Sequence, residues 1–327
     1  MRKLLLILIC YPCFIFGQQT INDSILINGT YRNFITYVPS INQSSQSTPL
    51  IFNLHGRTGS AWGQMWHGDF RDIADTANFI IVHPQGLLDN TGVTHWSLGQ
   101  SNIDDIGFLN LLYSYIVSIY NINLDKVYST GMSNGGYMSY YLACNMSDKI
   151  AAIASVTGAM GPFTQLNCNP THPTPVMEIH GTADLTVPFN DIVNGIEYWR
   201  DYNNCSVIAD TILMPDFNLG DLSTVKHIVY NNGDNGVTTE LFKIINGGHT
   251  WPGSNISNGV TNYDINASIE IWKFFSRYDI NGLINQTNSV NEYITKKDLI
   301  KIIDMLGRQT KHLKNQPLFY IYDDGTV

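Results

Sequence analysis

The sequence predicts an α/β fold in which a mostly parallel β-sheet carries helices on both of its faces. Short, almost continuous apolar runs alternate along the chain with longer mixed stretches, and strands that are buried on both faces have this composition. Hydrophobic residues make up 44% of the 327 residues and charged residues 14%, as in a globular protein. The chain is long enough for one large domain and a small appendage.

The elements can be placed in chain order from these runs. Segments that are apolar, or that alternate between apolar and polar residues, predict strands over 33–39, 49–56, 79–84, 126–130, 150–156, 175–181, 225–230 and 239–244. Helices are predicted over 60–77, 104–120, 137–144, 191–202 and 267–278. Two acidic residues open the second of these helices and suit its positive end. In the last helix we expect Ile269, Trp272 and Phe275 on one face.

Three regions are predicted along the chain. Residues 1–17 join Arg2 and Lys3 to a short apolar run and are typical of a secretory signal peptide. Residues 18–283 form the main α/β domain, and residues 284–327 form a linker and a small β tail. The linker runs from about Asn281 to Asn291. No other apolar run is long enough to span a membrane. We therefore expect a secreted or cell-surface protein.

Charge and cysteine content narrow the function further. The formal net charge is −9, which argues against nucleic acid and anionic polymers as partners and favours a neutral substrate. Three cysteines remain after the signal peptide. We expect Cys144 to be a small buried side chain on a helix, and Cys168 to pair with Cys205, because both lie in loop-like stretches. No cysteine or histidine cluster has the spacing of a zinc site, so no metal is expected.

The motif around which the chain is organised is Gly131-Met132-Ser133-Asn134-Gly135, which lies between a predicted strand and a predicted helix. A Gly-x-Ser-x-Gly motif in that context is typical of a nucleophile elbow, a tight turn that exposes a serine at the carboxyl end of a sheet. Glycine tolerates the dihedral angles and the close approach that such a turn requires. The motif alone also occurs in ordinary turns, so its partners decide the interpretation.

Two partners follow Ser133 in the order serine, acid, histidine that is typical of α/β-hydrolases: Asp184 and His249. Each comes directly after a predicted strand, at the sheet edge where ligands collect. His249 would accept the serine proton, and Asp184 would orient the imidazole. We expect the backbone N–H groups of Asn134 and Arg57 to stabilise the oxyanion.

The competing candidates have simpler structural explanations. His83 and His180 lie in or at the end of buried strands, and His55 precedes the oxyanion loop, which it could support. Asp191 and Asp201 fall on a predicted helix.

Tryptophans near the proposed loops are candidates for substrate binding, since a feruloyl ring or a sugar stacks on an indole. We assign this role to Trp96 and Trp251 and, with less support, to Trp62 and Trp66. The alternative is that these side chains pack the loops onto the body of the protein.

Six motifs, taken together, resemble the polyhydroxybutyrate depolymerase/feruloyl esterase family, the secreted esterases grouped with carbohydrate esterase family 1. In chain order the motifs are Leu54-His55-Gly56, the Trp96 loop, Asp104-Asp105-Ile106-Gly107-Phe108, the Ser133 motif, His180-Gly181-Thr182-Ala183-Asp184 and Gly248-His249-Thr250-Trp251-Pro252-Gly253. The resemblance covers about residues 30–278. It implies an α/β-hydrolase fold and a serine esterase without a cofactor. After Trp96 the chain lacks the cysteine-containing loop of many relatives.

The tail resembles the carboxy-terminal sorting domain of type IX secretion in the Bacteroidetes, through residues 301–310 and 315–327. It is expected to form a few antiparallel strands with a turn at Asp324-Gly325. The resemblance implies that the secretion machinery is a partner and that the tail takes no part in chemistry. The chain stops at Val327, a few residues before such tails commonly end.

The sequence therefore predicts a serine carboxylic-ester hydrolase. Its substrate would be a feruloyl or acetyl ester of plant polysaccharide, or a hydroxyalkanoate polyester or oligomer. Two alternatives remain: a peptidase-type acyl hydrolase, and a non-enzymatic surface-displayed binding protein on a hydrolase scaffold.

Overall fold

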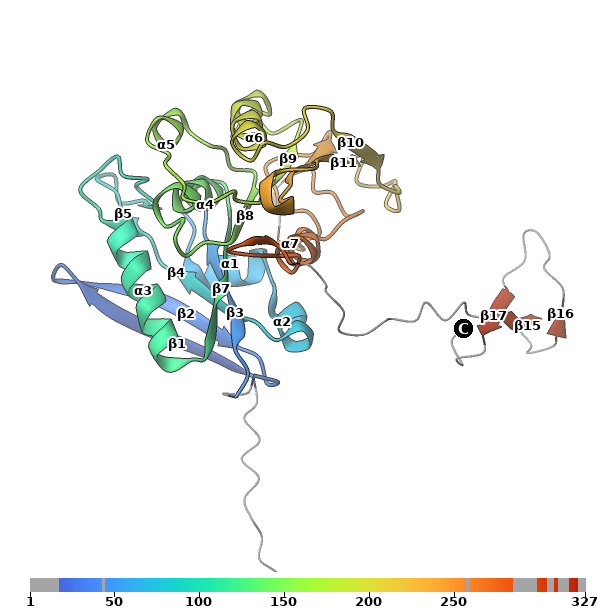
Figure 1. Cartoon of the computed structure of the whole chain (residues 1–327), viewed down its shortest axis with the longest axis horizontal. Coiled ribbons are helices and arrows are strands. Elements are labelled where there is room, and N and C mark those ends of the chain that lie inside the picture. Colours follow the sequence, from blue (N-terminus) through green and yellow to red (C-terminus); the bar gives the residue numbers. More distant parts are fainter. Residues whose placement is uncertain are drawn as a thin grey trace, which may run out of the picture. The chain divides into compact units, whose positions relative to one another are not determined.

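A ten-stranded sheet forms the frame of the main part of the chain (Figure 1). The structure, a computed structural model, describes residues 18–42, 45–256, 259–284, 299–304, 309–310 and 318–322. In spatial order the strands of this sheet are β1 (Gln19–Ile27), β2 (Thr30–Val38), β4 (Ile80–Pro84), β3 (Thr48–Leu54), β7 (Ile122–Met132), β8 (Ala152–Val156), β9 (Val176–Gly181), β12 (Thr239–Ile245), β11 (Thr224–Tyr230) and β10 (Asp210–Leu213).

The centre of the sheet is parallel, from β4 through β3, β7, β8 and β9 to β12. Antiparallel pairs close both ends, β1 and β2 on one side and β10 and β11 on the other. This confirms the predicted α/β architecture. Parallel strands send their carboxyl ends to one edge of the sheet, and the loops on that edge carry the three residues proposed as a triad.

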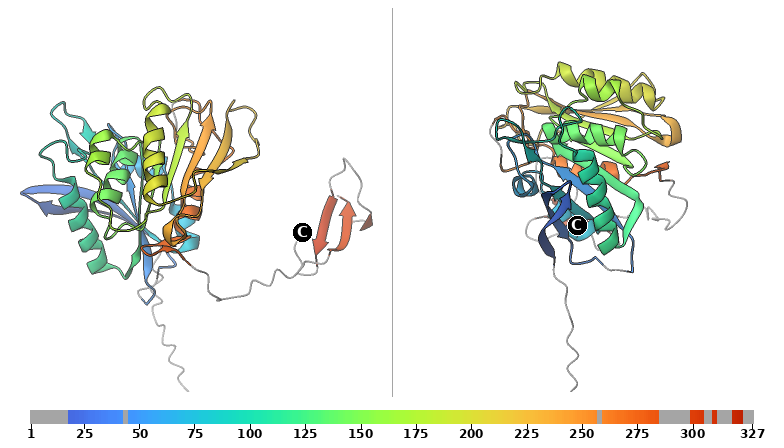
Figure 2. Two further views of the ribbon diagram at one scale, coloured as in Figure 1. Left: turned by 45° about the horizontal axis from the view of Figure 1, so that its top comes forward. Right: turned by 90° about the vertical axis from the view of Figure 1, so that its left-hand side faces the viewer.

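Helices lie on both faces of the sheet, as Figure 2 shows. They are α1 (Ala61–His67), α2 (Arg71–Ala77), α3 (Asp105–Ile119), α4 (Asn134–Asn145), α5 (Pro162–Leu166), α6 (Asn190–Tyr202) and α7 (Ala267–Phe275), with a 3₁₀ turn η1 (Asp234–Gly236). Side chains of α3, α4 and α6 share one buried cluster with Leu50 and Phe52 of β3, while α2 and α7 share another with Ile51. The alternation along β3 is the two-residue period of a strand buried on both faces.

The helix predicted over 60–77 is two helices, α1 and α2, separated by Gly68. Its carbonyl accepts a hydrogen bond from Asn53 Nδ2 at 2.8 Å instead of continuing the helix. A Cβ atom at Gly68 would lie 2.9 Å from the Trp251 ring. The space beside Gly68 is therefore filled by a side chain from a distant part of the sequence.

The face predicted for the last helix is buried at Phe275 and partly buried at Trp272, but not at Ile269. Ile269 is 41% exposed, whereas Ala267, Ile271, Phe274 and Phe275 are buried. These four follow the helical spacing from Ala267, and α7 ends at Phe275, after which β13 (Tyr278–Asp279) pairs with β14 (Gly282–Leu283). A second small pair, β5 (Leu87–Leu88) with β6 (Thr94–His95), lies ahead of α3.

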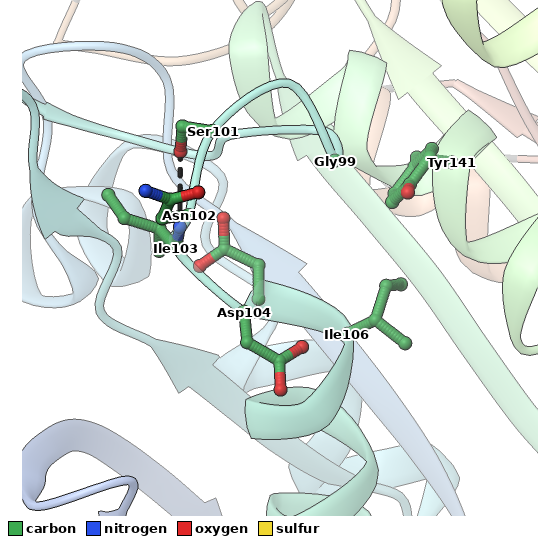
Figure 3. A pocket seen from close by; sticks show the side chains of 8 residues that line it. Gly99, Ser101, Asn102, Ile103, Asp104, Ile106 and Tyr141 are labelled. Carbon is green, nitrogen blue, oxygen red and sulfur yellow. Dashed lines mark hydrogen bonds between the residues drawn. The ribbon is translucent and has the colours of Figure 1, made fainter.

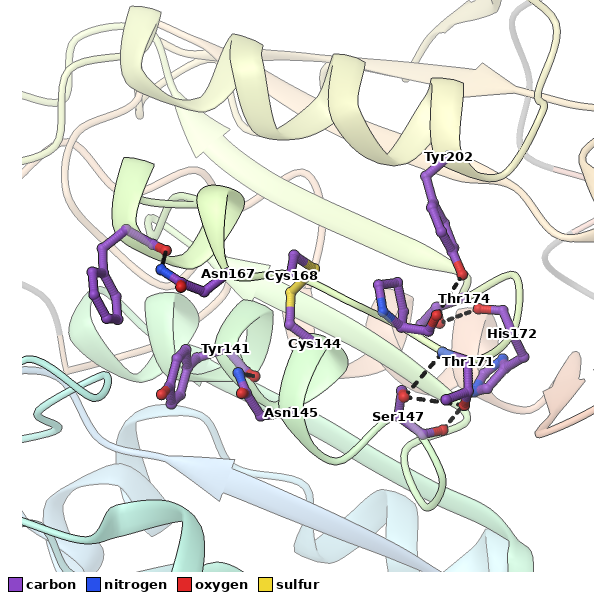
Figure 4. Close-up of a disulfide and its surroundings, with 12 residues drawn as sticks. Tyr141, Cys144, Asn145, Ser147, Asn167, Cys168, Thr171, His172, Thr174 and Tyr202 are labelled. Atoms are coloured by element: carbon purple, nitrogen blue, oxygen red, sulfur yellow. Dashed lines mark hydrogen bonds between the residues drawn. A yellow bond between two sulfur atoms is a disulfide. The ribbon is translucent and has the colours of Figure 1, made fainter.

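The disulfide differs from the predicted one, because Cys144 pairs with Cys168 and not Cys168 with Cys205 (Figure 4). Cys144 lies at the end of α4, and the segment after α5 brings the Cα of Cys168 to within 4.7 Å of its own. Cys205 is a buried free thiol. The sequence places Cys144 on a helix but does not reveal that α5 packs beside it.

The chain divides into two units, Met1–Ile284 and Asn285–Val327. In the second unit β15 (Leu299–Asp304) pairs antiparallel with β16 (Gln309–Thr310) and β17 (Leu318–Tyr322), as predicted for the β tail. The predicted signal peptide, residues 1–17, and the turn at Asp324-Gly325 lie outside the described residues. Among the helices of the described segments, none combines the length and the apolarity needed to cross a bilayer.

Candidate active site

Ser133 occupies a strained turn between β7 and α4. Its φ of 53° and ψ of −120° are unusual for a residue with a side chain, and its N–H donates to the Val156 carbonyl at 2.8 Å. A Cβ atom would lie 2.1 Å from the Leu54 carbonyl oxygen at Gly135 and 2.5 Å from it at Gly131. Both glycines are therefore required by the contact of this turn with the end of β3.

Asp184 and His249 are joined directly. Asp184 follows β9, His249 follows β12, and Asp184 Oδ2 lies 2.7 Å from His249 Nδ1. The other carboxylate oxygen accepts the backbone N–H groups of Thr186 and Val187 at 2.8 and 2.9 Å. Burial raises the pKa of the Asp184 carboxyl, but His249 and these N–H donors outweigh burial and hold the pKa below its usual value. The carboxylate is thus ionised at neutral pH, and Nδ1 is the nitrogen that donates to it.

The loop after His249 packs against the segment between α1 and α2. Trp251 lies against Gly68 and packs edge-to-face against Phe70, with 6.2 Å between the ring centroids. The Gly68 carbonyl in turn accepts a hydrogen bond from Asn53 of β3. Within the described part of the chain, the Ser133 hydroxyl makes no hydrogen bond to His249. Such bonds are often long in enzymes without substrate.

Two backbone N–H groups lie on segments that meet beside Ser133. Arg57 and Asn134 both have backbone N–H groups without an acceptor among the described residues. A Cβ atom on Gly56, which precedes Arg57, would lie 3.4 Å from the Ser133 Cβ, so the two loops are in contact. The Arg57 side chain pairs with Asp89 at 2.6 Å, which leaves only its backbone for an oxyanion.

His55 holds the loop that carries Arg57. Its Nδ1 donates to the Gly56 carbonyl at 2.7 Å, and its Nε2 accepts the Gly86 N–H at 2.9 Å. Burial lowers the pKa of this imidazole, in keeping with a neutral ring that accepts at one nitrogen. These two hydrogen bonds agree with the role expected of His55, which is to support the loop.

Neither Trp96 nor Trp251 is available to a ligand, which corrects the predicted stacking role of these two side chains. Each is 1% exposed. Trp96 Nε1 donates to the His55 carbonyl at 2.9 Å, and Trp251 Nε1 donates to Ser268 Oγ at 3.2 Å. Both indoles pack a loop onto the protein, which was the alternative interpretation.

The exposed tryptophans are the two on α1. Trp62 is 52% and Trp66 44% exposed, and their rings meet edge-to-face at 6.1 Å. Arg71 lies over one face of Trp66 at 3.8 Å. Between α1 and the loop after His249 lies a hollow of about 430 Å³, whose lining includes Trp66, His67 and Ile256. Sequence reasoning ranked these tryptophans last, although their spacing of four residues on a helix places them on one face.

The Asn134 side chain has a contact that sequence reasoning missed. Its Oδ1 accepts the Trp96 N–H at 2.6 Å, and its Nδ2 donates to the Trp96 carbonyl at 3.2 Å.

The loop beyond Trp96, with the start of α3 and Tyr141, surrounds a second hollow of about 230 Å³ (Figure 3). In the described ranges, no group of three or more His, Cys, Asp or Glu side chains is placed to hold a metal ion.

Comparison with known proteins agrees with the fold. A family model described as phospholipase/carboxylesterase matches residues 113–216, which include Ser133 and Asp184. A bifunctional acetylxylan esterase/xylanase of Neocallimastix patriciarum is 26% identical over 273 residues, 83% of this chain and 37% of that protein. Feruloyl esterase C of Emericella nidulans is 26% identical over 197 residues, 58% of this chain and 67% of that protein.

Among solved structures, an acetyl xylan esterase from Aspergillus awamori superimposes with a TM-score of 0.60 at 15% identity, over 80% of this chain and 99% of that one. The match to the bifunctional acetylxylan esterase/xylanase spans only 37% of that protein's length. The fold is that of the α/β-hydrolases, and the similarity to named esterases supports a carboxylic ester hydrolase.

Proposed function

We propose that this protein is a serine esterase that uses Ser133, Asp184 and His249 to cleave acyl esters of plant polysaccharide. The observation that carries the proposal is the 2.7 Å bond between Asp184 Oδ2 and His249 Nδ1, on the sheet edge where Ser133 stands on a strained turn. An imidazole whose Nδ1 donates to a carboxylate has Nε2 available as a base.

The reaction follows from these positions. His249 Nε2 takes the Ser133 hydroxyl proton as the serine oxygen bonds to the ester carbonyl carbon. The negative carbonyl oxygen accepts the N–H groups of Asn134 and Arg57. When the intermediate collapses, the ester C–O bond breaks and His249 gives its proton to the departing alcohol. Water repeats the sequence on the acyl-serine and releases the acid.

The substrate class rests on the relatives and on the surface near the site. The relatives are named acetylxylan and feruloyl esterases. Trp66 lines the hollow between α1 and the loop after His249, and the exposed ring of Trp62 lies beside Trp66. A ferulate ring or a sugar would stack there.

Export through residues 1–17 and the β tail, with type IX machinery as partner, belongs to the same proposal, since a polysaccharide substrate lies outside the cell.

The test is a side-by-side assay of the purified protein on methyl ferulate, acetylated xylan and a soluble hydroxybutyrate oligomer, with Ser133→Ala as the matched control. We expect release of ferulate or acetate, and a loss of about 10⁶-fold in kcat for the variant. Preference for the oligomer would point to a polyester depolymerase instead. A variant with substantial activity would refute Ser133 as nucleophile, and no activity on these or on a short nitrophenyl ester would favour a binding protein.

A further inference from the structure

Behind the Asp184–His249 bond lies a second acid–histidine pair that the mechanism above does not use. Glu178 and His180 stand two residues apart on β9, so both side chains point to the same face of the sheet. Both side chains are 0% exposed. His180 Nδ1 lies 3.0 Å from Glu178 Oε1, and the Tyr140 hydroxyl donates to Glu178 Oε2 at 3.1 Å.

The other nitrogen of His180 faces the proposed triad. His180 Nε2 lies 2.8 Å from the Val187 carbonyl oxygen and 3.4 Å from Asp184 Oδ2. Both neighbours are acceptors, so Nε2 must carry a proton. The Asp184 oxygen that it approaches is the same oxygen that accepts the N–H of His249. The two histidines therefore share one carboxylate oxygen.

The protonation of His180 follows from its partners. Nε2 needs a proton for its two acceptors, and Nδ1 meets a carboxylate that already accepts from Tyr140. Burial lowers the pKa of His180, but the hydrogen bond and charge of Glu178 outweigh burial and raise the pKa. Burial also raises the pKa of the Glu178 carboxyl, although its hydrogen bonds to His180 and Tyr140 oppose that shift. Both shifts favour one proton held between His180 Nδ1 and Glu178 Oε1 at neutral pH. We place this proton on Nδ1, as an imidazolium paired with the carboxylate, because Glu178 also accepts the Tyr140 hydroxyl.

We propose that the Glu178–His180 pair is a positioning element of the triad, which holds Asp184 in place and sets the basicity of His249 through the carboxylate oxygen that both histidines share. The inference rests on the proposed esterase function. The positive charge of the His180 imidazolium partly neutralises the Asp184 carboxylate. The carboxylate therefore stabilises a protonated His249 less than it would without His180. His180 is thus a positioning residue and takes no proton from the substrate.

The groups that face this pair come from several elements. Besides Glu178 and Asp184, they are Tyr137 and Tyr140 from α4 and Lys243 on β12. Tyr137 is close enough to Glu178 and Asp184 to interact with both carboxyl groups electrostatically. Lys243 is in register with His180 and places its ammonium 4.7 Å from the Phe189 ring centroid. His249 is in turn close enough to His67 of α1 for the two to interact electrostatically. Of these groups only Asp184 contacts Nε2 of His180, and with the Val187 carbonyl it determines the state of that nitrogen.

The experiment compares the pH profiles of kcat/KM for the full chain and two variants, His180→Gln and Glu178→Gln, on a short nitrophenyl ester. Each variant removes the buried positive charge, directly or by removing its counter-ion. Asp184 then favours protonated His249 more strongly. We expect the acidic limb of the profile to move to higher pH by about half a unit or more, with KM nearly unchanged.

The matched control is His227→Gln. His227 Nε2 pairs with the buried Glu240 Oε2 at 2.8 Å on strands β11 and β12, outside the site. This variant loses a similar contact, and its pH profile should superimpose on that of the wild type. Unshifted profiles for folded His180→Gln and Glu178→Gln would overturn the inference.

Nitrogen NMR of the histidine-labelled wild type provides a test that needs no variant to fold. At pH 8, where an ordinary histidine is neutral, His180 should show two protonated ring nitrogens. A neutral His180 would overturn the inference. A wild type without esterase activity but with a protonated His180 would refute the proposed function alone, so the two failures are distinguishable.

Discussion

At the scale of single residues, one buried histidine should make the stability of this protein sensitive to acid. His83 lies in the interior of β4, where every residue is buried, and burial lowers the pKa of its imidazole to about 3. In the unfolded chain the same ring has a pKa of about 6.5. Between these values the unfolded state binds a proton that the folded state does not. The stability from this site is therefore complete above pH 6.5 and is lost as the pH falls toward 3.

The variant His83→Gln should remove this dependence. From pH 7.5 to pH 5, the free energy of unfolding of the wild type should fall by about 2 kcal/mol more than that of the variant. Urea unfolding at the two pH values measures the difference. Parallel losses in the two proteins would mean that His83 becomes protonated in the folded state.

At the scale of elements, the site depends on how closely β3, β7 and α4 meet. The prediction concerns Gly135→Ala, whose new Cβ would lie 2.1 Å from a backbone oxygen of β3. Since neither partner is a flexible side chain, the strand and the helix must separate, at a cost of about 3 kcal/mol or more. Loss of kcat together with a lower urea midpoint would be the expected result.

Gly161→Ala is the matched control for that substitution. Gly161 has a φ of −65°, and a Cβ there would meet only the Tyr137 ring at 3.8 Å, an ordinary contact. Its kcat and urea midpoint should stay near those of the wild type. If Gly135→Ala behaved in the same way, the close packing of α4 on β3 would be wrong.

The disulfide joins two other elements, α4 and the segment after α5. It closes a loop of 24 residues in sequence, and loop closure of that size restricts the unfolded chain by about 3 kcal/mol. Replacing Cys144 and Cys168 together by alanine should lower the free energy of unfolding by that order. Reduced wild type should match the double variant in urea unfolding, whereas equal stability of the oxidised and reduced wild type would contradict the prediction.

At the scale of the whole molecule, the chain has two units, and we expect them to have separate roles. Ser133, Asp184 and His249 all come from the first unit, which β13 and β14 complete at Leu283. Deleting residues 285–327 should therefore leave kcat/KM and the melting temperature of the purified protein unchanged, while delivery to the cell surface or medium should fail. Lower kcat/KM in the truncated protein would assign the tail a structural role.

Local sequence patterns predicted the parallel centre of the sheet well and its margins poorly. The buried strands β3, β4 and β8 consist mostly of apolar residues, and a run of this kind is recognisable in the sequence. The outer strands β1 and β10 were missed, because their partly or fully exposed residues carry no burial signal. An edge strand is selected by its hydrogen-bonding neighbour, and that neighbour is not visible in a local window.

What the sequence alone determined is the chemistry that spacing encodes: a serine between two glycines at a strand–helix turn, followed after later strands by an acid and a histidine. What only the tertiary structure decided is which side chains meet across the chain. The Trp251 ring lies against Gly68, where α1 ends. Cys144 pairs with Cys168, and the Trp96 side chain is buried against the ring of His55. Backbone geometry propagates over a few residues, whereas packing joins residues that are far apart in sequence. For that reason the order of the proposed triad can be predicted from the sequence, whereas the side chains that surround it cannot.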